Sequence, residues 1–136
     1  MKFKRAILSV SLLAIILCLS VAVVGRDVSA EDACEPVLRH VVLFKFKDTA
    51  TPEQVKGVED AFRNLPKAID VIQDFEWGTN VSPEGHDQGF THCFFLTFKT
   101  EADRDAYLPH PAHKAFGKAL GPHLDKVCVV DYWTKN

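Results

Sequence analysis

The sequence has few cysteines, and none of them stands in a metal-binding pattern. It contains four in 136 residues, with no C-x-x-C pair and no Cys/His spacing typical of zinc. Beyond the N-terminal leader described below, three remain, Cys34, Cys93 and Cys128, an odd number from which no disulfide can be assigned. Cys93 and Cys128 lie in apolar, strand-like runs, where a thiol is ordinarily a core residue. The sequence therefore predicts no metal site.

Clustered positive charge is also missing. The whole chain has 16 Lys and Arg against 18 Asp and Glu, and four of the cations but only one of the acids fall within residues 1–30. The remainder has a net charge of about −5. A nucleic-acid surface needs grouped cations, so this class of partner is excluded. Solenoid-length repeats and low-complexity tracts are absent as well, and the length fits one small domain.

The N-terminus has the features of an export signal. Cations come first, then a long apolar run, then a small-residue cleavage site: Lys2, Lys4 and Arg5; Ala6 to Val24; and Val28-Ser29-Ala30. This pattern predicts a signal peptide over 1–30, a short lead-in over 31–36 and an exported domain over 37–133, periplasmic or secreted. The apolar run approaches the ~20 residues that span a bilayer, so an uncleaved membrane anchor is the alternative.

Four segments rich in β-branched and aromatic residues predict strands: 37–47, 71–81, 90–99 and 125–133. In the first of these, one face carries His40, Val42 and Phe44, and the other carries Val41 and Leu43. A strand that is solvated on one side should alternate cleanly between apolar and polar residues. This strand is therefore expected to be covered on both sides.

Two helical regions separate the strands. Thr51 and Gln54 form a capping box, and the helix that follows is expected to end near residue 64, where Pro66 interrupts it. Thr100 and Asp103 open the second helical region, which Pro109 interrupts before a further segment starts at residue 111. One apolar stripe at helical spacing marks the buried side of the first helix: Val55, Val58, Phe62 and Leu65.

The resulting order, β-α-β-β-α-β, predicts an α+β ferredoxin-like fold. Both helices then cover one face of a four-stranded antiparallel sheet and leave the other face bare. That bare face would be apolar and would aggregate unless covered. We therefore expect a homodimer joined through the open sheet face, which makes a dimeric α+β barrel.

Titratable side chains are densest at residues 107–116, Y-L-P-H-P-A-H-K-A-F. Pro111 suits the first turn of a helix, with His110 at the cap position and His113 inside the first turn. The partial positive charge of a helix N-terminus disfavours an imidazolium, so His113 is expected to be able to accept a proton. The alternative is that His110 is only a cap and His113 only a packed or solvated helix residue.

Four motifs together resemble the stress-responsive A/B barrel (Dabb) family. They are L-R-H-V-V-L-F-K-F-K-D around His40, E-W-G around Trp77, G-F-T-H around His92 and H-P-A-H at residues 110–113. The resemblance runs from about Leu38 to Tyr132, nearly the whole chain after the leader. It implies a dimeric α+β barrel with the predicted element order.

The resemblance also implies candidate site residues. A plant polyketide cyclase of this family closes a ring in an aldol-type reaction with a Tyr and a His, without metal or organic cofactor. Tyr107 and His113 occupy the matching positions, and His40 matches a pocket-lining residue on the first strand. His113 would remove a proton α to a carbonyl, while the Tyr107 hydroxyl would hold the substrate oxygen. His92, Trp77 and His110 are further candidates for ligand binding.

Two arrangements of the histidines follow from placing the first and third strands as parallel neighbours. His40 could pair with His92, and a metal site of both with His113 is conceivable but has no carboxylate or cysteine at ligand spacing. Three functions stay open at this point. The domain binds a small apolar or aromatic molecule; it is a cofactor-free acid/base enzyme of the cyclase or isomerase type; or it is a structural, stress-induced dimer without a ligand.

Overall fold

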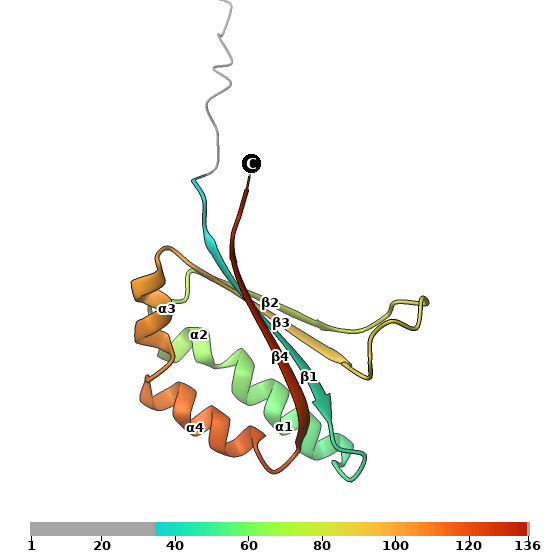
Figure 1. The fold of residues 1–136 in the computed structure, drawn as a ribbon. Helices are drawn as coiled ribbons and strands as arrows, with labels where there is room; N and C mark the ends of the chain where they lie inside the picture. The colour runs from blue at the N-terminus through green and yellow to red at the C-terminus, as the bar shows by residue number, and fades with distance from the viewer. Residues whose placement is uncertain (1–34, 136) are drawn as a thin grey trace, which may run out of the picture. The chain divides into compact units, whose positions relative to one another are not determined.

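The computed structural model describes residues 35–135, which form a four-stranded antiparallel sheet with helices on one face (Figure 1). The strand order is β2-β3-β1-β4. In chain order the elements are β1 (Leu38–Phe46), α1 (Pro52–Arg63), α2 (Leu65–Ala68), β2 (Asp74–Thr79), β3 (His92–Phe98), α3 (Glu101–Tyr107), α4 (Pro111–Leu120) and β4 (Leu124–Trp133). The predicted ferredoxin-like α+β order is confirmed.

The predicted signal segment, residues 1–30, lies outside the described residues, as does Cys34, so export and its membrane-anchored alternative stay predictions. Within residues 35–135, no helix has both the length and the apolar character needed to cross a membrane.

Both predicted capping boxes are present. The Thr51 hydroxyl accepts a hydrogen bond from the backbone N–H of Gln54 (3.3 Å), whose side chain accepts one from the N–H of Thr51 (2.9 Å). Thr100 and Asp103 repeat this arrangement at the start of α3, at 3.1 and 3.0 Å. Two otherwise unpaired N–H donors are satisfied at each helix start, which fixes where the chain leaves the preceding strand.

The predicted end of the first helix near residue 64 is confirmed, since α1 ends at Arg63, but a short helix was missed and one strand boundary is wrong. Pro66 does not end the helical region; it lies at the second position of the short helix α2, where its missing N–H costs nothing. The second strand begins at Asp74 rather than near residue 71. Ile72 is buried and its N–H bonds the carbonyl of Ile69, so the chain enters the core through a turn before it joins the sheet.

The expectation that the first and third strands are parallel is wrong. β1 pairs antiparallel with both β3 and β4, and β2 pairs antiparallel with β3. β3 lies between β1 and β2, which run in one direction, so β3 must run in the other. His40 lies opposite Leu96, whereas His92 lies opposite Phe44. The two histidines share a face but are separated by four residues, about 13 Å along the strand, and do not pair.

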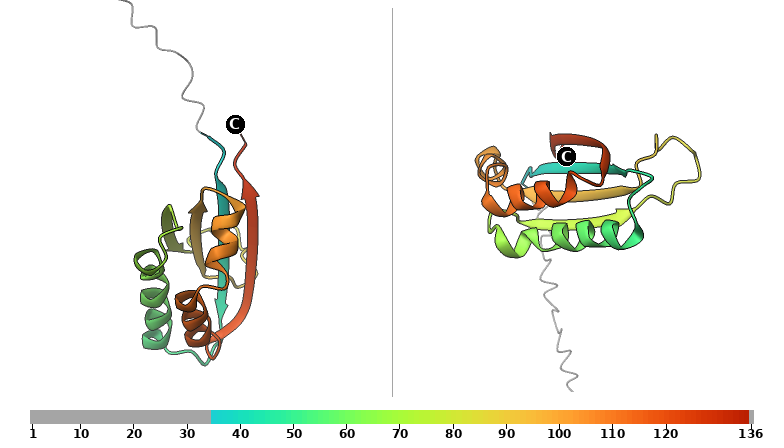
Figure 2. Two further views of the ribbon diagram at one scale, coloured as in Figure 1. Left: turned by 90° about the vertical axis from the view of Figure 1, so that its left-hand side faces the viewer. Right: turned by 90° about the horizontal axis from the view of Figure 1, so that it is seen from below.

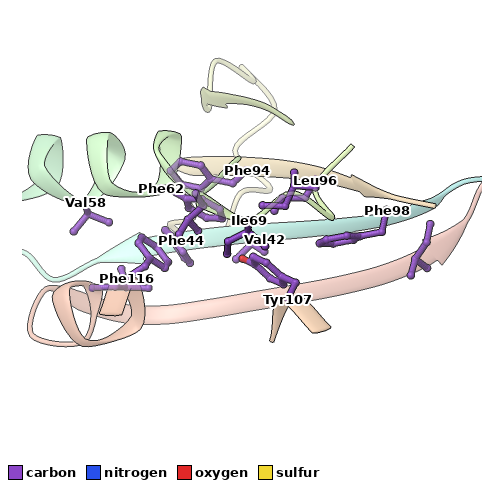
Figure 3. Close-up of a cluster of buried hydrophobic side chains, with 14 residues drawn as sticks. Val42, Phe44, Val58, Phe62, Ile69, Phe94, Leu96, Phe98, Tyr107 and Phe116 are labelled. Carbon is purple, nitrogen blue, oxygen red and sulfur yellow. The ribbon is translucent and has the colours of Figure 1, made fainter. Parts of the chain in front are cut away.

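The core lies between the helices and the covered face of the sheet, and aromatic side chains fill it (Figure 3). Phe62 of α1 stacks on Phe94 of β3 with ring centroids 4.1 Å apart, and Phe116 of α4 contacts Phe62 at 4.7 Å. The predicted stripe is confirmed at Val58 and Phe62 of α1 and at Leu65, which belongs to α2, while Val55 is half-buried. Stacked and tilted rings of this kind add to the free energy of apolar burial.

The other face of the sheet carries no helix, as the views in Figure 2 show. Its central residues, Val41, Leu43 and Phe95, are only half-buried. Cys93 and Cys128 lie here as free thiols, opposite Leu43 on either side, and not in the core as their apolar strands suggested. Two strand spacings, about 9.5 Å, separate them, which is too far for a disulfide within one chain.

Candidate functional site

A cavity of about 220 Å³ lies between the sheet and the helical layer, beside β4. It is below the ~300–1,000 Å³ of pockets for drug-sized ligands, so it suits a small molecule. Its lining residues come from β1, β4 and the helices: His40, Val42, Phe44, Phe62, Tyr107, Leu108, His113, Phe116, Gly117, Leu120, Val127 and Val129. Three of the candidates named from sequence, His40, Tyr107 and His113, meet here.

The periodicity of two elements gives this cavity a polar end and an apolar end. On β1, His40 and Phe44 point to the same side because side chains alternate along a strand. On α4, His113 and Leu120 are seven residues apart and share a face. The histidines lie at one end and Phe44 and Leu120 at the other. A bound molecule would therefore meet hydrogen-bonding groups at one end only.

His40 is 5% exposed and bonds the carboxylate of Asp131 through Nδ1, at 2.6 Å. The other oxygen of Asp131 accepts a hydrogen bond from Arg104, at 3.0 Å. Burial lowers the pKa of His40, and the hydrogen bond to Asp131 opposes this to a smaller extent. Because a carboxylate only accepts, Nδ1 of His40 is the donor, and neutral His40 keeps Nε2 as a proton acceptor.

Tyr107, at the end of α3, is 1% exposed and packs between the two imidazoles of the cavity. Its ring centroid lies 4.3 Å from that of His113 and 5.7 Å from that of His40. Figure 3 shows it among the core side chains near Val42 and Phe98. Burial raises the pKa of Tyr107, so the hydroxyl stays protonated at neutral pH and can donate a hydrogen bond to a ligand oxygen.

The turn between α3 and α4 orients His113. Its Nδ1 lies 2.9 Å from the carbonyl oxygen of Leu108, which can only accept, so Nδ1 donates. In the neutral ring, Nε2 is then free to accept a proton. His110 is the predicted cap of α4, and its Nδ1 accepts a hydrogen bond from the N–H of Ala112 at 3.2 Å. His110 does not line the cavity described above.

The remaining candidates, His92 and Trp77, also lie away from this cavity. His92 bonds Glu59 of α1 (3.0 Å) and the hydroxyl of Thr91 (2.8 Å), at the far end of the covered face. The ring of Trp77 stacks on Phe94, with centroids 5.6 Å apart. The bond to Glu59 joins β3 to α1, and the stacking of Trp77 on Phe94 joins β2 to β3. Across residues 35–135, no three or more His, Cys, Asp and Glu side chains are grouped so as to hold a metal ion.

Asp131 and Arg104 were missed as site residues. Asp131 had a weak signal, since it shares a strand face with the apolar Val127 and Val129, and a lone carboxylate there needs a partner. Arg104 had none, because a cation on a short helix is ordinarily a solvated residue. Only the fold brings α3 and β4 together at this point.

Sequence and structure comparisons identify the family of this chain. A family model described as the stress-responsive A/B barrel domain matches residues 38–134. The chain belongs to this family. The Dabb resemblance predicted from four motifs is thereby confirmed. Among curated relatives of this Dabb chain, the stress-response A/B barrel domain-containing protein HS1 of Arabidopsis thaliana is 40% identical over 75% of the chain and 93% of its own length. Olivetolic acid cyclase of Cannabis sativa is 30% identical over 70% of the chain and 94% of its own length.

Solved structures of similar proteins include an enzyme. The hydroxynitrile lyase from Passiflora edulis matches this Dabb chain with a TM-score of 0.69 and 27% identity, over 73% of the chain and 94% of the lyase. A protein of unknown function from Thermobifida fusca, described as dimeric and ferredoxin-like, matches with a TM-score of 0.63 and 28% identity, over 71% of the chain and 90% of that protein. The proteins similar to this chain thus include stress-response proteins, a cyclase and a lyase.

Proposed function

We propose that this Dabb domain binds a small, largely apolar or aromatic carbonyl compound in the cavity beside β4. The observation that carries the proposal is the meeting of His40, Tyr107 and His113, from three different elements, at one end of an otherwise apolar cavity. Few polar groups converging in an apolar pocket are typical of a small-molecule site. The aromatic and aliphatic walls would hold the body of the ligand, and the polar end would orient its oxygen.

The second candidate function is cofactor-free proton transfer on such a ligand. Nδ1 of both His40 and His113 is held by a fixed acceptor, Asp131 or the Leu108 carbonyl, which leaves each Nε2 able to take a proton. The Tyr107 hydroxyl would donate to the carbonyl oxygen as charge develops there. A cyclase and a hydroxynitrile lyase among the similar proteins support an acid/base site on this scaffold.

The third part of the proposal is a homodimer formed through the open sheet face. The half-buried Val41, Leu43 and Phe95 give that face an apolar centre. Similar structures are described as dimeric, which supports self-association. Two such faces would cover each other in an isologous contact, the arrangement expected of a symmetric dimer. The cavity opens on the opposite side of the sheet, so dimer formation would leave it accessible.

Acetophenone is a suitable probe for both binding and proton transfer. We expect saturation-transfer NMR to detect binding, and proton NMR in D₂O to detect enzyme-dependent exchange of the α-hydrogens for deuterium. His113→Ala should slow this exchange by about 10²–10⁴-fold if His113 is the base. Tyr107→Phe should slow exchange while preserving binding, because it removes only the hydroxyl.

Two controls separate the candidate functions. His86→Ala, in the exposed loop between β2 and β3, should leave the exchange rate unchanged. Pivalophenone has no α-hydrogens and reports binding alone. Binding without exchange would support a carrier and exclude the enzyme for this ligand class. No binding of either ketone by a folded dimer would favour the structural alternative.

A further inference from the structure

Arg104 is clamped between two carboxylates beside the cavity. Its Nη1 donates to Oδ2 of Asp131 at 3.0 Å, while its Nε and Nη2 donate to Oδ1 of Asp105 at 3.1 and 2.9 Å. The Arg104 side chain is 22% exposed and that of Asp131 28%, so both partners of this contact are partly accessible to solvent. The planar guanidinium satisfies both carboxylates at once, which a lysine could not do with the same geometry.

Three charged or titratable groups are therefore arranged in a row. Arg104 on α3 bonds one oxygen of Asp131 on β4, and the other oxygen bonds Nδ1 of His40 on β1. Without the guanidinium, the negative charge of Asp131 would act on His40 alone and would favour the imidazolium. With it, the carboxylate is already neutralised and pinned in orientation. His40 then gains less from taking up a second proton.

We propose that Arg104 is a positioning residue of the ligand site, which acts through Asp131 to hold His40 neutral, with its proton on Nδ1 and Nε2 free as an acceptor. The role rests on the proposed function only in assigning His40 to the ligand site. Arg104 itself does not line the cavity, so it need not touch the ligand. The residue at position 104 would therefore affect the protonation state of His40 without contact with the ligand.

The other groups that face His40 fit this assignment. Tyr107 packs against the ring and stays protonated. His113 lies across the cavity and, like Arg104, lowers the pKa of His40 through its charge. Asp131 is the carboxylate that acts in the opposite direction. Since Asp131 is the group that Arg104 neutralises, replacing Arg104 removes one restraint on protonation of His40 and strengthens the opposing influence.

The experiment is a pH titration of His40 in the full-length, ¹⁵N-labelled protein, read from the ¹⁵N shifts of both ring nitrogens. These shifts distinguish the two neutral tautomers from each other and from the imidazolium. A substitution that only lowered the stability of the fold would not change them. In Arg104→Leu we expect the titration midpoint to move upward, with the ratio of imidazolium to neutral His40 at pH 6 rising about threefold or more. Arg104→Lys keeps the positive charge but loses the planar guanidinium, so the titration midpoint of its His40 should lie between those of Arg104→Leu and the wild type.

Arg63→Leu is the matched control, because Arg63 pairs with Asp60 on the exposed side of α1, away from the cavity. It should leave the His40 titration unchanged. If Arg104→Leu does not fold, Arg104→Gln provides the same loss of charge with a polar side chain. An unchanged midpoint and tautomer in a folded, neutral Arg104 variant would overturn the proposal. The readout needs no ligand, so failure of acetophenone binding would reject the proposed function without affecting this result.

Discussion

The two faces of the sheet use neighbouring residues for different purposes. Phe94 and Phe95 are adjacent on β3, yet Phe94 is fully buried beneath the helices, whereas Phe95 is half-buried on the open face. Phe94 stacks on Phe62 and Trp77. The guanidinium carbon of Arg39 lies over the ring of Phe95, 5.2 Å from its centroid. Two residues of identical chemistry thus differ in cover, because the helices pack on Phe94 and no helix packs on the face that carries Phe95. The covered face should determine stability, and the open face should determine association.

Replacement of Phe94 by alanine tests the first half of this comparison and should have the largest effect. The change removes a fully buried ring from the centre of the aromatic cluster and leaves a cavity, at a cost of about 3–5 kcal/mol in the free energy of unfolding. Urea denaturation followed by circular dichroism measures this. Phe95→Ala is the matched control, and in dilute, monomeric protein its cost should be clearly smaller. Equal losses for the two variants would contradict the division of the faces.

A charge placed in the open face tests the second half. Val41 lies opposite Phe95 on one side and Val130 on the other, at the middle of this face. Val41→Asp would bury an unpaired carboxylate in the proposed interface, so we expect the dimer dissociation constant to rise about 100-fold or more by sedimentation equilibrium. Val81→Asp, at a side chain that is 91% exposed in the loop, is the matched control and should not change it. A wild-type protein that is monomeric at micromolar concentration would reject the homodimer.

The sequence was sufficient for the order of the elements, for both capping boxes and for the faces of the strands, because each depends on local spacing. Strand alternation separated His40 and Val42 from Val41 on β1, and the cap pattern located the start of α1 at Thr51. The direction of β3 relative to β1 was not predicted correctly, since it depends on how the chain crosses between the two. That error also produced the unsupported pair of His40 and His92.

The candidate site was predictable only in part. His40, Tyr107 and His113 were selected from a motif resemblance, and the fold brings these three together. His92 satisfies its polar atoms elsewhere, in bonds to Glu59 and Thr91. The residues that hold His40, Asp131 and Arg104, lie far from it in sequence, and no local pattern joins β1, β4 and α3. Long-range hydrogen bonds of this kind depend on strand register, which a single sequence leaves open.

The smallest predicted effect compares a buried histidine of the covered face with an exposed one in the loop. Burial lowers the pKa of His40 in the folded protein below its ordinary value of about 6.5. At pH values below about 6.5, the unfolded chain therefore binds more protons at His40 than the folded protein does. The contribution of neutral His40 to the free energy of unfolding is complete above about pH 6.5 and is lost as the pH falls towards the folded-state pKa. His40→Gln should reduce the loss of unfolding free energy between pH 7.5 and pH 5, measured by urea denaturation at each pH. His86→Gln, in the exposed loop, should leave that pH dependence as in the wild type. If both variants keep the full pH dependence, His40 is not held neutral by burial, and the arrangement of Arg104, Asp131 and His40 has no energetic consequence for folding.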